Sequence, residues 1–143
     1  MRFMILVKSN VQAEAGIPPD SADIAAMGRY NQKMIDAGVM LAGDGLAASR
    51  KGARITFEPA GKQTVVDGPF AEAKELIAGF WMIRADSFED AMKWARMAPM
   101  NVGDVLEVRQ VFEPEDFEVD EITEETLRKE RQFIDATVKP VTR

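Results

Sequence analysis

The chain has 143 residues, a formal net charge of −6, and neither cysteine nor histidine. This length favours one domain with a substantial core, and the missing residue types exclude disulfides, thiolate zinc sites and histidine-based catalysis. Residues 1–112 carry 14 acidic and 13 basic side chains, whereas residues 113–143 carry 10 and 5. We therefore expect a near-neutral α+β domain over 1–112 and an acidic extension over 113–143. Neither has the concentrated basic surface that nucleic acids or anionic membranes require.

The first part of the chain predicts a strand, a helix and a second strand. Residues 3–7 form an apolar run that suits a strand buried on both faces. The run is too short for a secretory leader or a membrane span, so we expect a cytoplasmic protein. An apolar stripe after Asp20 predicts a helix that ends at Gly38, and residues 39–42 predict a short strand. The Gly-Asp-Gly sequence around Asp44 then marks either a bulge or the lining of a cleft.

The remaining elements complete a recognisable order. They are a hairpin, a strand that is apolar on both faces, a helix and a last strand, at residues 54–66, 77–83, 88–98 and 105–112. The acidic extension adds one helical pattern with a narrow apolar stripe, at residues 124–137. This order predicts a ferredoxin-like βαββαβ fold with an antiparallel sheet and an inserted hairpin.

The predicted sheet needs a cover on its second face. Two helices can cover only one face, yet residues 3–7 and 77–83 are apolar on both faces. A homodimer that packs sheet against sheet is the simplest solution, because closed two-fold dimers are the commonest oligomers. The alternative is a monomer in which the acidic helix covers that face.

The most unusual segment is Asp67-Gly68-Pro69-Phe70-Ala71-Glu72-Ala73-Lys74-Glu75, which joins two apolar strands. The simplest interpretation is a polar turn: Gly68 and Pro69 shape it, Phe70 anchors it, and Glu72 and Lys74 form salt bridges. Functional residues often lie on loops that a rigid scaffold holds, so Asp67 is also a candidate catalytic acid or base.

A second candidate site lies on the predicted last strand. Glu107 and Arg109 are two residues apart, so their side chains point to the same face. If that face is interior, the two charges pair with each other or bind a ligand. The planar guanidinium of Arg109 suits a carboxylate or a phosphate. No residue spacing indicates a metal cage, a phosphate-binding glycine loop or a haem site, so we expect neither metal nor cofactor.

The segment from Asp67 to Glu75, with Ile77-Ala78-Gly79-Phe80 after it, resembles the signature of the DGPF, or YCII-related, family of small bacterial proteins. Weaker similarities occur at residues 1–6, 37–39, 43–46 and 107–111. The resemblance implies a dimeric α+β barrel and an accessory role in regulation by sigma factors of the extracytoplasmic type. Related enzymes use a histidine, whereas Arg29 or Tyr30 would stand at that point of this chain.

Three hypotheses of function follow. The first is a homodimer that holds a small anionic ligand at Arg109 and Glu107, with Asp44, Tyr30 and Arg29 as further contacts. The second is a cofactor-free lyase or isomerase of a small, aromatic-derived acid, in which Asp67 transfers the proton and Arg109 holds the carboxylate. The third is a protein-interaction module that acts through the acidic helix.

Overall fold

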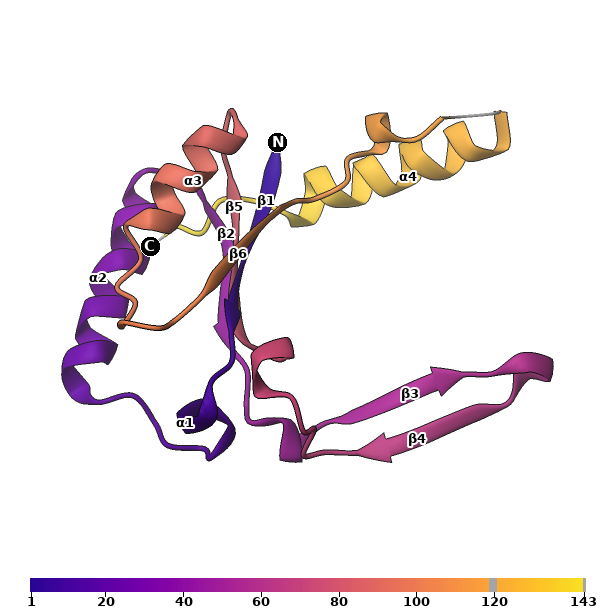
Figure 1. Cartoon of the computed structure of the whole chain (residues 1–143). Helices are drawn as coiled ribbons and strands as arrows, with labels where there is room; N and C mark the ends of the chain where they lie inside the picture. Colours follow the sequence, from indigo (N-terminus) through magenta and orange to yellow (C-terminus); the bar gives the residue numbers. More distant parts are fainter. Residues whose placement is uncertain (119–120, 143) are drawn as a thin grey trace.

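The computed structural model describes residues 1–118 and 121–142. Its centre is an antiparallel sheet in the order β2-β5-β1-β6, formed by β1 (Arg2–Lys8), β2 (Met40–Gly45), β5 (Ile77–Arg84) and β6 (Leu106–Gln110). Two helices, α2 (Ser21–Asp36) and α3 (Phe88–Arg96), cover one face of this sheet (Figure 1). The arrangement confirms the predicted ferredoxin-like α+β fold.

Both covering helices begin at polar caps. The Asp20 side chain accepts a hydrogen bond from the Asp23 backbone N–H (2.8 Å), and the Ser87 hydroxyl accepts one from the Asp90 N–H (3.1 Å). Each cap satisfies a backbone donor that has no partner within its own helix. The caps therefore set where α2 and α3 start above the sheet.

The core lies between the sheet and these two helices. Its fully buried large side chains come from the central strands and from α2: Phe3, Ile5, Ile83 and Met34. Alternate residues of β1 and β5 face the helices, as the period of a strand requires. The core therefore uses one face of each central strand and leaves the other face without helical cover.

The second face of the sheet, which we call the open face, is apolar at its centre. Its central side chains are Met4 and Leu6 of β1, which lie opposite Met82 and Phe80 of β5. All four are half-buried within the single chain. Both α2 and α3 lie on the other side of the sheet (Figure 1). A further layer is needed to remove this apolar strip from water.

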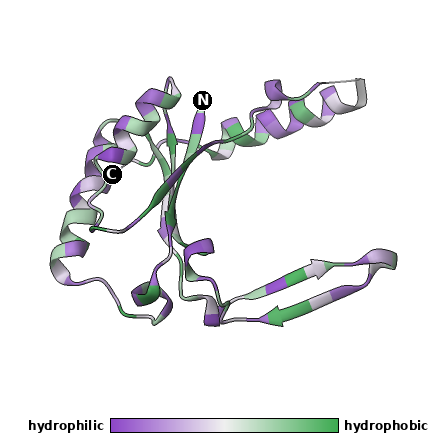
Figure 2. Ribbon diagram, in the orientation of Figure 1, coloured by the Kyte–Doolittle hydropathy of each residue, from purple (hydrophilic) through white to green (hydrophobic). Residues whose placement is uncertain are grey.

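The inserted hairpin projects away from the sheet on the side of the open face (Figure 1). Within the described residues its strands, β3 (Ala53–Phe57) and β4 (Gln63–Asp67), pair with each other alone. Large apolar side chains on it are exposed, including Ile55 (54%) and Phe57 (76%), and Figure 2 shows the hydrophobic stretches along both strands. An isolated two-stranded hairpin is marginally stable in water, so this one is suited to packing on another surface.

The acidic extension leaves the sheet and then returns to it. It begins with an ion pair between Glu113 and Arg2 (3.0 Å). The helix α4 (Glu121–Thr137) then extends outward on the same side as the hairpin and does not lie across the open face (Figure 1). Beyond it, the Val141 N–H donates to the Met40 carbonyl oxygen (2.7 Å) at the edge of β2. The monomer alternative, with the acidic helix on the open face, does not match this arrangement.

Three local features differ from the predictions. The segment between the predicted strand at residues 3–7 and the helix after Asp20 contains an additional short helix, α1 (Val11–Glu14), whose first turn is capped by the Asn10 side chain at the Ala13 N–H. Strand β2 continues through Asp44, and its register shift lies between Met40 and Ala42. Short 3-10 turns occupy several connections: η1 (Ser49–Lys51), η2 (Pro59–Gly61), η3 (Ala73–Glu75) and η4 (Pro114–Asp116). No helix in the described ranges combines the length and the apolar character that crossing a membrane would demand.

Candidate functional site

Charged residues flank the apolar centre of the open face at the β6 edge. The Arg109 guanidinium lies 3.3 Å from one carboxylate oxygen of Glu107, and the Lys8 ammonium lies 3.8 Å from the other. Glu107 is opposite Leu6 and Arg109 is opposite Met4, so both belong to the open face. This charged cluster of Lys8, Glu107 and Arg109 contains two cations for one carboxylate.

Asp44 lies on the same face at the opposite edge of the sheet. The register runs from Asp44 to Phe80, from Phe80 to Leu6, and from Leu6 to Glu107. Three strand spacings separate the two carboxylates, or roughly 14 Å. The structure thus brings Asp44, Glu107 and Arg109 onto one face, with an apolar strip between the two edges.

The other predicted site residues lie elsewhere. Tyr30 is 5% exposed within the core, and its hydroxyl donates to the Trp94 carbonyl oxygen (3.0 Å). Burial raises the pKa of Tyr30 to about 12, so the phenol is neutral at physiological pH. Arg29 is exposed on α2. Asp67 is exposed at the base of the hairpin, opposite Ala53.

The loop after Asp67 is held by close backbone contacts. The Gly68 N–H donates to the Gly52 carbonyl oxygen (2.9 Å), and a Cβ on Gly68 would lie 1.9 Å from the carbonyl oxygen of Ser49. No other residue fits at Gly68 without movement of the backbone. The Phe70 N–H donates to the Ser49 hydroxyl (3.1 Å), and the Arg54 guanidinium lies 3.9 Å from the centre of the Phe70 ring.

The charged side chains of this loop point to solvent. Glu72 and Lys74 are both exposed. Neither has an ion-pair partner within 4.0 Å in the part of the chain that the structure describes. The salt bridges expected for this turn are therefore absent there. Hydrogen bonds of the backbone and of the Ser49 hydroxyl hold the loop.

Ser49 connects this loop to α1 through Glu14. The Ser49 hydroxyl and backbone N–H donate to one carboxylate oxygen of Glu14 (2.5 and 3.1 Å), and the Ser9 hydroxyl donates to the other (3.2 Å). The hydrogen bond from the Ser49 side chain is the main cause of the lowered pKa of Glu14. Sequence reasoning missed this clasp of Glu14 and Ser49, since isolated polar residues 35 positions apart carry no recognisable pattern.

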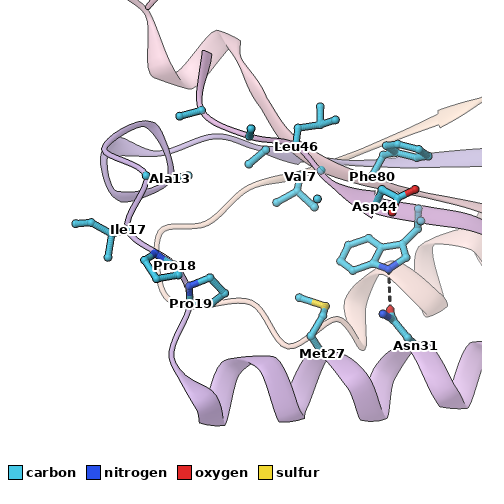
Figure 3. A pocket seen from close by; sticks show the side chains of 18 residues that line it. Val7, Ala13, Ile17, Pro18, Pro19, Met27, Asn31, Asp44, Leu46 and Phe80 are labelled. Carbon is cyan, nitrogen blue, oxygen red and sulfur yellow. Dashed lines mark hydrogen bonds between the residues drawn. The ribbon is translucent and has the colours of Figure 1, made fainter. Parts of the chain in front are cut away.

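A cavity of about 610 Å³ lies behind this clasp, between the α1–α2 connection, α2 and the sheet (Figure 3). Most of the residues lining this helix-side pocket are apolar or glycine, including Ile17, Pro18 and Met27. Its polar side chains include Asn31, whose amide oxygen accepts a hydrogen bond from the Trp81 indole N–H (2.9 Å). The sequence signals a helical face at Met27 and Asn31, but it gives no sign of a pocket.

Comparison with known proteins identifies the family. A family model described as the YCII-related domain matches residues 1–115. The chain belongs to the YCII-related family. This match agrees with the resemblance seen in the segment from Asp67 to Glu75, and it covers the sheet, the hairpin and both covering helices.

The proteins similar to this YCII-related chain include the following two. An uncharacterised protein of Rhizobium meliloti (strain 1021) is 49% identical over 37 residues, which are 26% of this chain and 30% of that protein. The chain thus spans about a third of that relative's length. The 5-chloro-2-hydroxyhydroquinone dehydrochlorinase TftG of Burkholderia phenoliruptrix AC1100, in complex with 2,5-dihydroxybenzoquinone, is 14% identical, with a TM-score of 0.40. That comparison covers 82% of this chain and 100% of TftG.

Acidic residues of this YCII-related chain do not form a metal centre in the described ranges. No group of three or more histidine, cysteine, aspartate or glutamate side chains there is placed to hold a metal ion. The two candidate binding sites are therefore the charged cluster on the open face and the helix-side pocket. The first suits an anion, and the second suits an apolar molecule.

Proposed function

We propose that this YCII-related protein is a homodimer that closes over its open face and binds a small anionic ligand between the two sheets. The dimer is supported by the apolar strip of Met4, Leu6, Phe80 and Met82, which a second copy would cover. An isologous two-fold contact uses the same patch on both copies, so one apolar strip serves as both halves of the interface.

The projecting elements support the same assembly. The hairpin and α4 both reach outward on the side of the open face, one near each end of the strands (Figure 1). The exposed Ile55, Phe57 and Val65 would find apolar surface on a second copy packed between them. An interface made of sheet, hairpin and helix would bury more area than the sheet alone, as stable dimers require.

The ligand class follows from the charged cluster, and this is the observation that carries the proposal. Two cations, Lys8 and Arg109, share the single carboxylate of Glu107 beside an apolar strip. In an open subunit water solvates the unpaired positive charge, but closure would remove that water. Buried charge then needs a partner, and a carboxylate or phosphate would supply it. The ligand's apolar part would lie over Leu6 and Phe80.

The other hypotheses have less support. A lyase or isomerase would need Asp67 near Arg109, yet Asp67 lies at the base of the hairpin and Arg109 on the far edge strand β6. An interaction through α4 has its exposed Phe133 in its favour. An accessory role beside a sigma factor is compatible with a ligand-binding dimer and remains a prediction from the family resemblance.

The test is thermal unfolding with benzoate and with phenyl phosphate, using uncharged benzamide as the matched neutral compound. A ligand at one hundred times its dissociation constant stabilises by about 2.7 kcal/mol, so binding is readily seen. We expect stabilisation by the anions that Arg109→Ala removes. The control variant Arg96→Ala, at an exposed position on α3, should still be stabilised by the anions. Stabilisation that survives Arg109→Ala, or none with either anion, would contradict the proposed anion site.

A further inference from the structure

We propose that the helix-side pocket is a second, separate binding site for an uncharged, mostly apolar small molecule that carries a hydrogen-bond acceptor such as a ketone oxygen. The pocket lies on the helix side of the sheet, whereas the charged cluster lies on the open face. Its volume of about 610 Å³ falls within the range of pockets that hold small ligands. The proposal does not depend on dimer formation or on the anion site.

The inner wall of the pocket is held rigidly. The Trp81 indole is 5% exposed, donates its N–H to Asn31, and meets the Tyr30 ring edge-on at 5.3 Å. Gly43 lies directly against this indole, since a Cβ there would come within 2.7 Å of the indole Cδ1. An aromatic wall fixed by a hydrogen bond and by ring packing is preformed for a planar apolar ligand.

Asn31 supplies a free hydrogen-bond donor. The indole N–H of Trp81 can only donate, so the amide oxygen of Asn31 must face it and the amide NH₂ must point away. Within the described residues that NH₂ group has no hydrogen-bond partner. Figure 3 shows the amide nitrogen on the Met27 side of the oxygen, at the pocket. A ligand with a carbonyl oxygen would satisfy this donor while its apolar part fills the space beside Met27.

The charge of the lining selects against anions. Among the described residues that line the pocket, Asp44 is the one charged residue, and it carries a negative charge. Its register with Phe80 places its side chain toward the open face. Arg50 packs against Gly16 nearby, but its guanidinium donates to the Glu14 carbonyl oxygen (3.3 Å). With no lining cation, a carboxylate would lose its hydration without gaining a partner.

The outer wall depends on the clasp of Glu14 and Ser49. Ile17, Pro18 and Pro19 of the α1–α2 connection line the mouth of the pocket (Figure 3). This connection begins right after Glu14, whose carboxylate accepts hydrogen bonds from the Ser9 hydroxyl and from the hydroxyl and backbone N–H of Ser49. The clasp therefore positions the mouth, and the pocket is a built feature of the fold.

Benzophenone tests the proposal, because it is an uncharged aromatic ketone that inserts into nearby C–H bonds on irradiation. Its matched anion is 4-benzoylbenzoate, which has the same ketone and an added carboxylate. Each would be titrated against the full chain, irradiated, and its adducts counted by intact mass and located by fragment mass spectrometry. We expect benzophenone adducts on the segment from Ile17 to Met27, and at least tenfold weaker labelling of that segment by 4-benzoylbenzoate.

Asn31→Asp is the decisive variant, because its carboxylate still accepts the Trp81 N–H but offers no donor to a ketone. It should raise the half-saturating concentration of benzophenone about tenfold. Ala13→Leu fills part of the pocket without touching Asn31, so it should also weaken labelling. It serves as the test variant if Asn31→Asp fails to fold. Arg109→Ala should leave benzophenone labelling unchanged, which separates this site from the anion site. Adducts on Met4 or Met82 instead, or unchanged labelling in both pocket variants, would overturn the proposal.

Discussion

Replacing Phe80 by alanine should weaken the proposed dimer while leaving the fold of each subunit intact. The Phe80 ring lies at the centre of the open face, between Asp44 and Leu6 in the cross-strand row. It points away from the core that β5 shares with α2 and α3. Its removal therefore takes apolar area from the interface and little from the subunit's own core.

The size of the effect follows from burial and symmetry. Full burial of a phenylalanine side chain is worth about 1.5–3 kcal/mol. Phe80 is already half-buried in the single chain, so dimer formation gains only about 1 kcal/mol from each ring. A two-fold interface contains the ring twice, so Phe80→Ala should cost about 2 kcal/mol, or roughly a 30-fold increase in the dissociation constant of the dimer.

Sedimentation velocity over a range of protein concentrations measures this shift. The matched control is Phe88→Ala, which removes another half-exposed phenylalanine from the helix side of the sheet, where its ring packs 6.2 Å from that of Phe3. We expect dimerisation to weaken in Phe80→Ala and to stay unchanged in Phe88→Ala. An unsubstituted chain that is monomeric at tens of micromolar, or a Phe80→Ala dimer as tight as the original, would refute the interface.

Three further predictions concern the loop, the clasp and the core. Gly68→Ala should cost roughly 1–3 kcal/mol in urea unfolding because its Cβ collides with a backbone carbonyl, whereas Gly45→Ala, which has open space, should cost far less. Glu14→Gln should lower the melting temperature at pH 7. That difference should fade as the pH falls below about 4.5, since the stabilisation from a lowered carboxyl pKa is complete above the unfolded value and is lost as the pH falls through the folded one. The single tyrosine, Tyr30, should ionise near pH 12 in an absorbance titration and near pH 10 in urea, so stability should fall as the pH rises between these values; equal midpoints would contradict its burial.

The parts of the fold that periodicity encodes could be predicted from the sequence. Continuous apolar runs of strand length located β1 and β5. Because both runs are apolar on both faces and two helices cover only one, the sequence also predicted a cover for the second face. The shared face of Glu107 and Arg109 followed from their spacing. Tyr30 had a usable signal too, since it lies three residues after Met27 and four before Met34, which is the spacing of a buried helical stripe. Reading it as a ligand contact placed it outside that stripe.

Other parts depend on contacts that no local pattern encodes. The clasp joins Glu14 at the end of α1 to Ser49 at the start of η1, and each residue alone looks like an ordinary surface side chain. The helix-side pocket results from the distance between α2 and the sheet, which packing sets. The outward direction of α4 was equally hidden, because a narrow apolar stripe allows either packing on the subunit's own sheet or on a second copy.

The segment from Asp67 to Glu75, which most strongly resembles the family signature, shapes the backbone as well as carrying charged side chains. Its charged side chains, Glu72 and Lys74, face solvent, while the Gly68 N–H donates to the Gly52 carbonyl oxygen and the Phe70 N–H donates to the Ser49 hydroxyl. Strand β5 begins just after this loop and carries Phe80 toward the open face and Trp81 toward the helix-side pocket. The loop thus fixes the start of a strand that both proposed sites share. Substitutions at Gly68 should therefore disturb both sites together, whereas substitutions at Glu72 should disturb neither.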